Sequence, residues 1–320
     1  MQQVELKGHS GCRIYLIIPE GSSALVRKIS KDVEYNQRLR KQCFKQKTYR
    51  SNYAHVPEVL EEGMIKDLYY YDMEYVRGIS VSSLLESCSV DKIESISNFL
   101  VNIVDENQKT ETFDENGWTS AIAHKLKSTF DNIPKRCCNK TIKESFELLS
   151  NHKWTDIGTS SSHGDLTLEN IIYSYDEKFY LIDFLDTFYE TWIIDMSKIL
   201  QDLVVGWAFR HQFMKTDAIS ENTKIRILLL NKQFISSIED VLVNEKLWDD
   251  IYACLLLNLL RIIPYIQDDR IHVFLNKSIN TIMSNIERGG LYEFINTALR
   301  WPIYEVPGSQ TKMDVNVPRR

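Results

Sequence analysis

Residues 161–184 read SSHGDLTLENIIYSYDEKFYLIDF, and this stretch limits what the chain can fold into more than any other. Its two apolar runs, NIIYSY and FYLIDF, are joined by a short polar connection, a pattern that predicts a β-hairpin. His163, Asp165 and Asn170 lie on the loop that enters the first strand, and Asp183 ends the second. Because a hairpin brings its two ends together, we expect these four polar side chains to converge.

Their chemistry suits phosphoryl transfer. The amide oxygen of Asn170 and the carboxylate of Asp183 are hard oxygen ligands, which Mg²⁺ takes while keeping waters and nucleotide phosphates. Asp165, upstream on the same loop, is free to accept a proton from an incoming hydroxyl group. Phosphoryl transfer needs this division between a metal for charge and a carboxylate for the nucleophile. The plainer alternative is that His163 and Asp165 cap a turn and Asp183 is a polar strand end.

The rest of the chain changes character near residue 77. Before that point, β-rich runs such as CRIYLII and LYYYDMEYV surround one helix, VEYNQRLRKQCFKQKTY, which Asp32 is placed to cap. After it, helical apolar spacing dominates, as in VDKIESISNFLVNIVDENQK. The sequence predicts an α+β, bilobal chain: a mainly antiparallel five-stranded sheet lobe (1–77), a large helical lobe (78–307) and a flexible tail (308–320).

Composition excludes several classes of protein. Hydrophobic content of 43% and charged content of 26% are ordinary for a soluble domain, and a net charge of −6 argues against a nucleic-acid binder. We see no membrane-spanning run and no signal peptide, so no membrane partner is expected. The six cysteines are scattered without paired C-x-x-C spacing, which predicts reduced thiols in a cytoplasm. Monomer and homodimer both stay open.

The segment HGDLTLEN followed by LIDF resembles the catalytic loop and metal-binding segment of the aminoglycoside phosphotransferase and choline kinase group. These are small-molecule kinases with a protein-kinase-like fold. The resemblance implies that Asp165 is the catalytic base, with His163 beside it, and that Asn170 and Asp183 hold Mg²⁺. It implies ATP as phosphoryl donor, with GTP as an alternative, and a nucleotide-binding lobe in residues 1–77.

The same resemblance assigns residues around the nucleotide. Lys28 fits the strand lysine that pairs with phosphates, although its neighbour Arg27 leaves a shift of one residue open. Glu34 is the candidate for the helix glutamate that orients this lysine. The stretch KGHSG, with Gly8 and Gly11, sits where the phosphate-covering loop should be.

Two further segments fit the group, each beside a plainer explanation. MEYVRG (73–78) resembles the hinge between the lobes, with Glu74 and Val76 contributing backbone hydrogen bonds to adenine; a strand end explains it equally well. Asp195 resembles the aspartate at a helix start that braces the catalytic loop, and it is also an ordinary helix-capping residue.

The acceptor site is the least determined part. In the resembling families it lies in the helical lobe beside the catalytic loop. A sugar, a sugar acid, an amino alcohol or an aminoglycoside would suit, and Arg261 could instead have a structural partner. The candidate residues are Asp186, Asp202, Trp207, Asn258, Arg261 and Tyr265.

Two other functions compete with a small-molecule kinase. A protein kinase needs an activation segment with an A-P-E-like anchor, but only eleven residues separate Asp183 from Asp195. A nucleotide-sensing pseudokinase usually lacks one of the key residues, and here all are present. Gly164 and Leu185 replace the Arg and Gly of the protein-kinase pattern, as the small-molecule group tolerates.

One helix is unusually basic. Nine Lys or Arg residues lie between Arg27 and Arg50, against two acids. Arg38, Lys41 and Lys45 share a helical face, which we interpret as solvated, with an acidic partner as the alternative.

Overall fold

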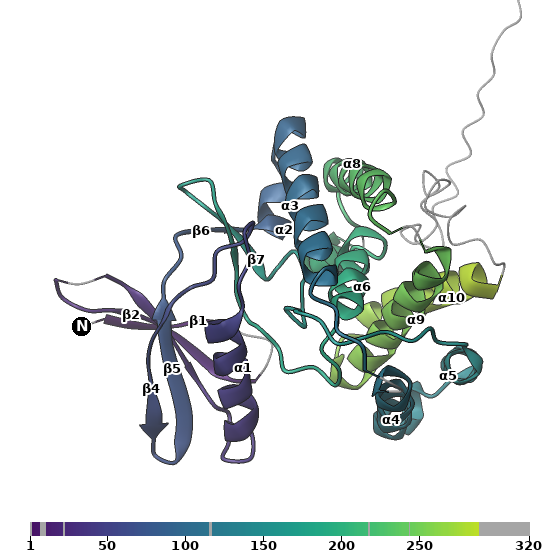
Figure 1. The fold of residues 1–320 in the computed structure, drawn as a ribbon, viewed down its shortest axis with the longest axis horizontal. Coiled ribbons are helices and arrows are strands. Elements are labelled where there is room, and N and C mark those ends of the chain that lie inside the picture. Colours follow the sequence, from purple (N-terminus) through teal and green to yellow (C-terminus); the bar gives the residue numbers. More distant parts are fainter. Residues whose placement is uncertain are drawn as a thin grey trace, which may run out of the picture.

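The computed structural model describes residues 2–6, 11–21, 23–114, 117–216, 218–242 and 244–287. Figure 1 shows a strand-rich lobe formed by the N-terminal part of the chain and, beside it, a larger lobe made mainly of helices. The predicted tail 308–320 and Gly8 lie outside the described residues.

The N-terminal lobe contains the predicted five-stranded sheet. Its strands pair antiparallel throughout, in the order β1-β2-β3-β5-β4. Val26 of β3 and Tyr71 and Met73 of β5 are buried in the core of this lobe. The strands are β1 (Gln2–Leu6), β2 (Arg13–Ile18), β3 (Leu25–Ile29), β4 (Val59–Ile65) and β5 (Leu68–Glu74).

Helix α1 (Asn36–Thr48) covers this sheet. The Asp32 carboxylate accepts a hydrogen bond from the backbone N–H of Tyr35 at 2.7 Å, so Asp32 supports the turn that starts the helix, as predicted. Leu39 and Cys43 pack into the core of the lobe. Gln42, adjacent to Cys43, is fully buried.

The C-terminal lobe is built around one large apolar core. Helix α3 packs against α8, and α6 packs against α9 (Figure 1). The α3 face predicted from spacing is correct, because Ile93, Ile96, Leu100 and Val104 are fully buried. The α-helices are α2 (Val81–Leu85), α3 (Val90–Gln108), α4 (Gly117–Asn132), α5 (Lys140–Asn151), α6 (Trp192–Leu203), α7 (Arg210–Thr216), α8 (Glu221–Ile238), α9 (Glu245–Ile262) and α10 (Asp269–Glu287). Short 3₁₀ helices occur at Lys135–Cys137, Trp207–Phe209 (η2) and Ile263–Tyr265 (η3).

The predicted hairpin is present as β7 (Ile171–Ser174) and β8 (Phe179–Leu181), with β6 (Gly78–Ser80) added on the β7 side. Only glycine fits at position 78, since a Cβ there would lie 2.4 Å from the carbonyl oxygen of Tyr173. The hairpin therefore attaches to the segment that leaves the N-terminal lobe.

These observations confirm the α+β architecture of a sheet lobe followed by a helical lobe. All six cysteines are free thiols. Within the described ranges, no helix combines the length and hydropathy needed to cross a bilayer.

Candidate active site

Helix α6 supports the loop that carries Asp165. Both carboxylate oxygens of Asp195 accept backbone hydrogen bonds, from His163 N–H at 2.6 Å and from Gly164 N–H at 2.7 Å. Burial raises the pKa of Asp195 to about 7, while Lys45 and the two N–H donors act in the opposite direction. Asp195 therefore lies where a residue that supports the loop of Asp165 was expected.

Gly164 has a structural reason to be glycine. Its φ is +89°, and a Cβ would lie 2.5 Å from the carbonyl oxygen of Leu185 and 2.7 Å from a methyl group of Thr187. The arginine of the protein-kinase pattern would therefore be strained here and would collide with the segment after Asp183.

His163 is fully buried and serves as a support rather than a proton carrier. Its Nε2 atom lies 2.8 Å from the carbonyl oxygen of Ile182, and its Nδ1 accepts a hydrogen bond from the Asp165 N–H at 3.2 Å. Burial lowers its pKa to about 4, with Asp165 opposing the shift. The neutral ring, packed on Phe184, fixes the loop against the end of β8. These contacts favour a positioning role for His163 over the catalytic role that the sequence predicted.

The Asp165 carboxylate is oriented by two neighbours. Lys198 Nζ on α6 lies 3.0 Å from Oδ1, and the Asn170 amide nitrogen donates to Oδ2 at 3.1 Å and to the backbone carbonyl at 2.8 Å. Burial tends to raise the pKa of Asp165, but Lys198 outweighs it and the net pKa is lowered. Asp165 is thus an ionised, fixed carboxylate at the end of the hairpin.

On the other side of the hairpin, Lys28 pairs with Asp183. Lys28 is 1% exposed; its Nζ makes an ion pair with Asp183 Oδ1 and lies 3.3 Å from Gln42 Oε1. Burial lowers the pKa of Lys28, but the Asp183 carboxylate more than offsets this, so its pKa is raised. Arg27 faces the other way and pairs with Asp72 at 2.7 Å, which settles the strand register in favour of Lys28.

The structure corrects the assignment of Glu34. It precedes α1 and is exposed, because the helix starts only at Asn36. The α1 side chain that meets Lys28 is Gln42, two turns further along. An amide therefore stands where a glutamate was expected.

Asn170 and Asp183 lie at adjacent ends of β7 and β8, where the Ile182 N–H donates to the Asn170 carbonyl at 3.0 Å. The amide nitrogen of Asn170 is used on Asp165, which leaves its oxygen as a possible ligand, and Asp183 has its second carboxylate oxygen beyond Lys28. Asp183 also has a φ of +61°, a strained conformation for a non-glycine residue. The donor set fits Mg²⁺, although the described residues contain no group of three or more His, Cys, Asp or Glu side chains that could hold a metal.

Asp202 is a second brace, not an acceptor ligand. Its fully buried carboxylate accepts from the Leu168 N–H at 2.7 Å and from the Ala208 N–H at 3.0 Å. Burial, followed by the charge of Glu169, raises its pKa to about 7. Both of its oxygens are occupied by backbone, so the prediction for Asp202 was wrong.

The three acceptor candidates of α9 and η3 lie in different environments. Asn258 is buried and donates to Ser197 Oγ at 2.8 Å, joining α9 to α6, whereas Tyr265 is 84% exposed. Arg261 lies between these extremes, and its Nη1 donates to Asn258 Oδ1 at 3.2 Å. Burial lowers the pKa of Arg261, and the negative charge of Asp165 opposes this shift. Trp207 packs under the Arg210 guanidinium at 4.9 Å.

The hinge residues lie at the end of β5. The Glu74 N–H is already used, because it donates to the Glu58 carbonyl at 3.0 Å. Of the phosphate-loop glycines, Gly11 has a φ of +76° and begins the described part after the loop.

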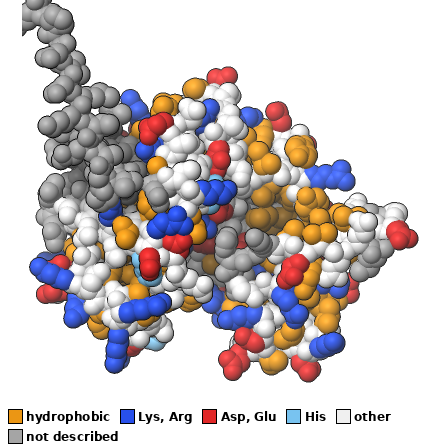
Figure 2. Space-filling model, turned by 180° about the vertical axis from the view of Figure 1, so that it is seen from behind, with side chains coloured by type: hydrophobic (Ala, Val, Ile, Leu, Met, Phe, Trp, Pro, Cys, Tyr) orange, Lys and Arg blue, Asp and Glu red, His pale blue; other side chains and the backbone are white. Residues whose placement is uncertain are grey.

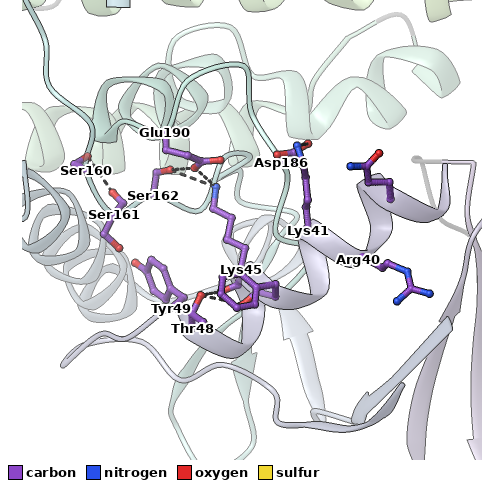
Figure 3. Close-up of a pocket in the computed structure, with 12 residues that line it drawn as sticks. Arg40, Lys41, Lys45, Thr48, Tyr49, Ser160, Ser161, Ser162, Asp186 and Glu190 are labelled. Atoms are coloured by element: carbon purple, nitrogen blue, oxygen red, sulfur yellow. Dashed lines mark hydrogen bonds and ion pairs between the residues drawn. The ribbon is translucent and has the colours of Figure 1, made fainter. Parts of the chain in front are cut away.

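The basic face of α1 has a partner inside the chain. Lys45 reaches across to the C-terminal lobe, where it pairs with Glu190 and donates to the Leu185 carbonyl at 2.9 Å. Lys41 lies 3.6 Å from Asp186. Figure 3 shows these side chains beside a cavity of about 600 Å³, with Ser162 between α1 and the opposite segment. The interpretation of this face as solvated is therefore wrong for Lys45, and Asp186 lies at the joint between the lobes.

Sequence reasoning missed Lys198 and Gln42. Lys198 follows Asp195 by three residues and so shares its helix face, a signal that could have placed it at the same loop. Gln42 lies one residue before the buried Cys43 and gave no such signal, because its partner Lys28 is remote in sequence.

The chain resembles known proteins in structure rather than in sequence. No protein-family profile and no curated sequence matches the chain. Among solved structures, a thermostable mutant of aminoglycoside phosphotransferase APH(4)-Ia aligns with a TM-score of 0.60 at 11% identity, covering 91% of this chain and 96% of its own. A ternary complex of the same enzyme with AMP-PNP and hygromycin B gives 0.59 at 11% identity, covering 91% and 95%. A candidate fructosamine-3-kinase from Thermobifida fusca gives 0.53 at 12% identity, covering 89% and 94%.

These neighbours extend over nearly the whole of both chains, so the likeness is to the complete two-lobed structure and not to one motif. The expected resemblance is confirmed at the level of fold. The chain has the fold of the aminoglycoside phosphotransferase-like group of small-molecule kinases.

Proposed function

We propose that the protein is a kinase that transfers the γ-phosphoryl group of ATP, or of GTP, to a hydroxyl group of a small polar acceptor. The observation that carries the proposal is the pair of carboxylates at the hairpin end. Asp165 is held by Lys198 and Asn170, while Asp183 is held by Lys28. The neighbour with AMP-PNP and hygromycin B bound supports a nucleotide and a small acceptor as ligands.

The nucleotide would lie between the lobes. Lys28, in β3, would meet its phosphates, and the loop that contains Gly8 and Gly11 would cover them. Because the Glu74 N–H is engaged by Glu58, Glu74 can offer adenine its carbonyl oxygen, and Val76 can offer its N–H. Figure 2 shows hydrophobic side chains gathered on the part of the N-terminal lobe that borders the joint, which suits an apolar base.

Asn170 and Asp183 would hold Mg²⁺, which neutralises charge on the transferring phosphates. Their oxygens are of the right type, and Asn170 is oriented by its bonds to Asp165.

Asp165 would receive the proton of the acceptor hydroxyl. The acceptor O–H bond breaks, the oxygen forms a bond to the γ-phosphorus, and the bridging P–O bond breaks to release the nucleoside diphosphate. Lys198 keeps Asp165 ionised until that moment. The braces Asp195 and Asp202 hold both ends of the loop so that Asp165 does not have to reorganise.

A screen for nucleoside diphosphate release over hydroxylated metabolites, with ATP or GTP and Mg²⁺, tests this function. Activity with one acceptor and its loss in Asp165→Asn would support it. Nucleotide binding without turnover of any acceptor would favour the pseudokinase alternative instead.

A further inference from the structure

Four cationic side chains from four different helices interact with one another or with Asp165. Lys125 of α4 and Arg261 of α9 each lie 5.9 Å from the centre of the Phe188 ring, so both cations are beside the same aromatic side chain. Lys198 of α6 lies 3.0 Å from Asp165. Arg38 of α1 acts electrostatically on both Lys125 and Arg261, which brings the N-terminal lobe into the group.

The positive charges of this cluster are not balanced by carboxylates. Asp165 already pairs with Lys198, and the hydrogen bond made by Arg261 goes to the neutral amide of Asn258. Within the described ranges, neither Lys125, Arg38 nor Arg261 forms an ion pair with a carboxylate. The excess positive charge is notable in a chain whose net charge is −6.

The cations also lower one another's pKa. Burial lowers the pKa of Lys125 to about 8, and Arg261 and Arg38 add to this shift. Burial and Arg38 likewise lower the pKa of Arg261. Half-buried like charges without counter-charges are unfavourable, and an anion placed among them would relieve both effects.

We propose that the acceptor is itself an anion, and that its carboxylate or phosphate group binds between Lys125 and Arg261 while its hydroxyl group faces Asp165. This inference rests on the proposed kinase function. Arginine and lysine together suit an oxyanion, since the guanidinium can donate two parallel hydrogen bonds and the ammonium adds a point charge.

The same charges disfavour the acceptors of the structural neighbours. Hygromycin B appears in the complex of one neighbour, and an aminoglycoside or an amino alcohol would bring positive charge to the cluster of Lys125, Arg261 and Arg38. Like charges across a site reject a ligand as effectively as poor shape does. The cluster therefore selects hydroxy acids, sugar acids or sugar phosphates over cationic acceptors.

Binding of anions without chemistry is the first test. With AMP-PNP and Mg²⁺ saturating, the melting temperature is measured against glucuronate, glucose 1-phosphate, glucose and glucosamine. We expect the two anions to stabilise the protein and the other two to have little effect. Comparison of glucuronate with glucose 1-phosphate distinguishes a carboxylate from a phosphate site. If no anion stabilises the protein, the proposal is overturned.

Charge variants locate the site. Lys125→Gln should weaken anion binding about ten- to hundred-fold, as loss of a charge-assisted hydrogen bond implies, and leave AMP-PNP affinity unchanged. The matched control is Lys127→Gln, an exposed lysine two residues along the same helix. Equal losses of AMP-PNP affinity and anion affinity in Lys125→Gln would assign the cluster to the nucleotide and overturn the proposal.

A variant with reversed charge at Lys125 tests the proposal through the turnover of different acceptors. Lys125→Glu should lower kcat/KM for anionic acceptors and raise it for amine-bearing ones, whereas Lys127→Glu should change neither. Wild-type preference for neutral or cationic acceptors would overturn the anion proposal while leaving the kinase intact. Anion binding at Lys125 without any nucleotide binding would instead contradict the kinase function alone.

Discussion

The Nζ atom of Lys198 lies 3.0 Å from Oδ1 of Asp165, so this carboxylate is paired with a cation from the same helix that supports its loop. The side chain of Lys198 is only 13% exposed, which limits screening of this pair by water. Asp195, three residues earlier on α6, fixes the backbone of the loop. One helix therefore sets both the position and the charge of Asp165.

Lys198→Met tests this relationship through pH. Because Lys198 lowers the pKa of Asp165, its removal should raise that pKa. The base acts in its ionised form, so the acidic limb of the profile of kcat/KM against pH should move to higher pH. Lys198→Arg should restore the limb; a lower rate with an unmoved limb would assign Lys198 a purely structural role.

Asp165→Asn should lower turnover by about 10²–10⁴-fold, the usual contribution of a general base. Nucleotide affinity should stay nearly the same, because in the proposed mechanism Asp165 meets the acceptor, whereas the Lys28–Asp183 pair meets the nucleotide. Steady-state kinetics and nucleotide titration on one preparation provide both values. A variant with close to full turnover would contradict the assignment of the base.

Asp183→Asn should remove the Mg²⁺-dependent part of the stabilisation by ATP, since it neutralises one of two proposed ligands. Melting temperatures with ATP, with and without Mg²⁺, measure this part. Asp186→Asn is the matched control, because Asp186 contacts Lys41 at 3.6 Å rather than Lys28. An unchanged Mg²⁺-dependent shift in Asp183→Asn would mean that the cation is held by other residues.

The sequence predicted best where function depends on neighbours along the chain. His163, Asp165, Asn170 and Asp183 lie within one hairpin, and hairpin geometry alone brings them together. Alternation and helical spacing likewise predicted the sheet and the buried face of α3, because these periods follow from local backbone geometry.

Prediction failed where a side chain contacts a residue from another segment of the chain. Glu34 was chosen as the only glutamate between Lys28 and Glu58, but the turn at residues 32–35 delays α1, and its second turn presents Gln42 instead. Asp202 and Asn258 looked like site residues because they are polar in apolar helices. Their backbone and serine partners come from other segments, and only tertiary packing shows that these partners are there.

The lobes are tied together by Lys45, and Lys45→Met should loosen them. Lys45 pairs with Glu190 and donates to the Leu185 carbonyl and to Ser162 Oγ (Figure 3). We expect faster hydrogen exchange in residues 185–190 and a rise in the KM for nucleotide, because the cleft between the lobes would be less well ordered. Lys47→Met, which removes a pair with Glu62 inside the N-terminal lobe, is the control. Similar exchange in both variants would show that Lys45 does not set the arrangement of the lobes.

Asp202→Asn should destabilise the protein more at pH 5 than at pH 8. Burial raises the folded-state pKa of Asp202 to about 7, above the value of about 3.9 expected in the unfolded chain. A raised pKa means that the folded state binds the proton more tightly, so this contribution is fully present below pH 4 and is lost as pH rises through 7. Asparagine does not titrate, and the stability difference between the two proteins should therefore shrink by about 2 kcal/mol from pH 5 to pH 8.

Urea unfolding at the two pH values measures this difference, and Asp131→Asn, at an exposed position, provides the control. Asparagine keeps one oxygen for the N–H groups of Leu168 and Ala208, so the variant should fold. A difference that grows with pH would mean that the two N–H donors outweigh burial and that Asp202 is ionised in the fold. In that case Asp202 would hold the catalytic loop as a charged brace, and its contribution would be lost in acid, not in alkali.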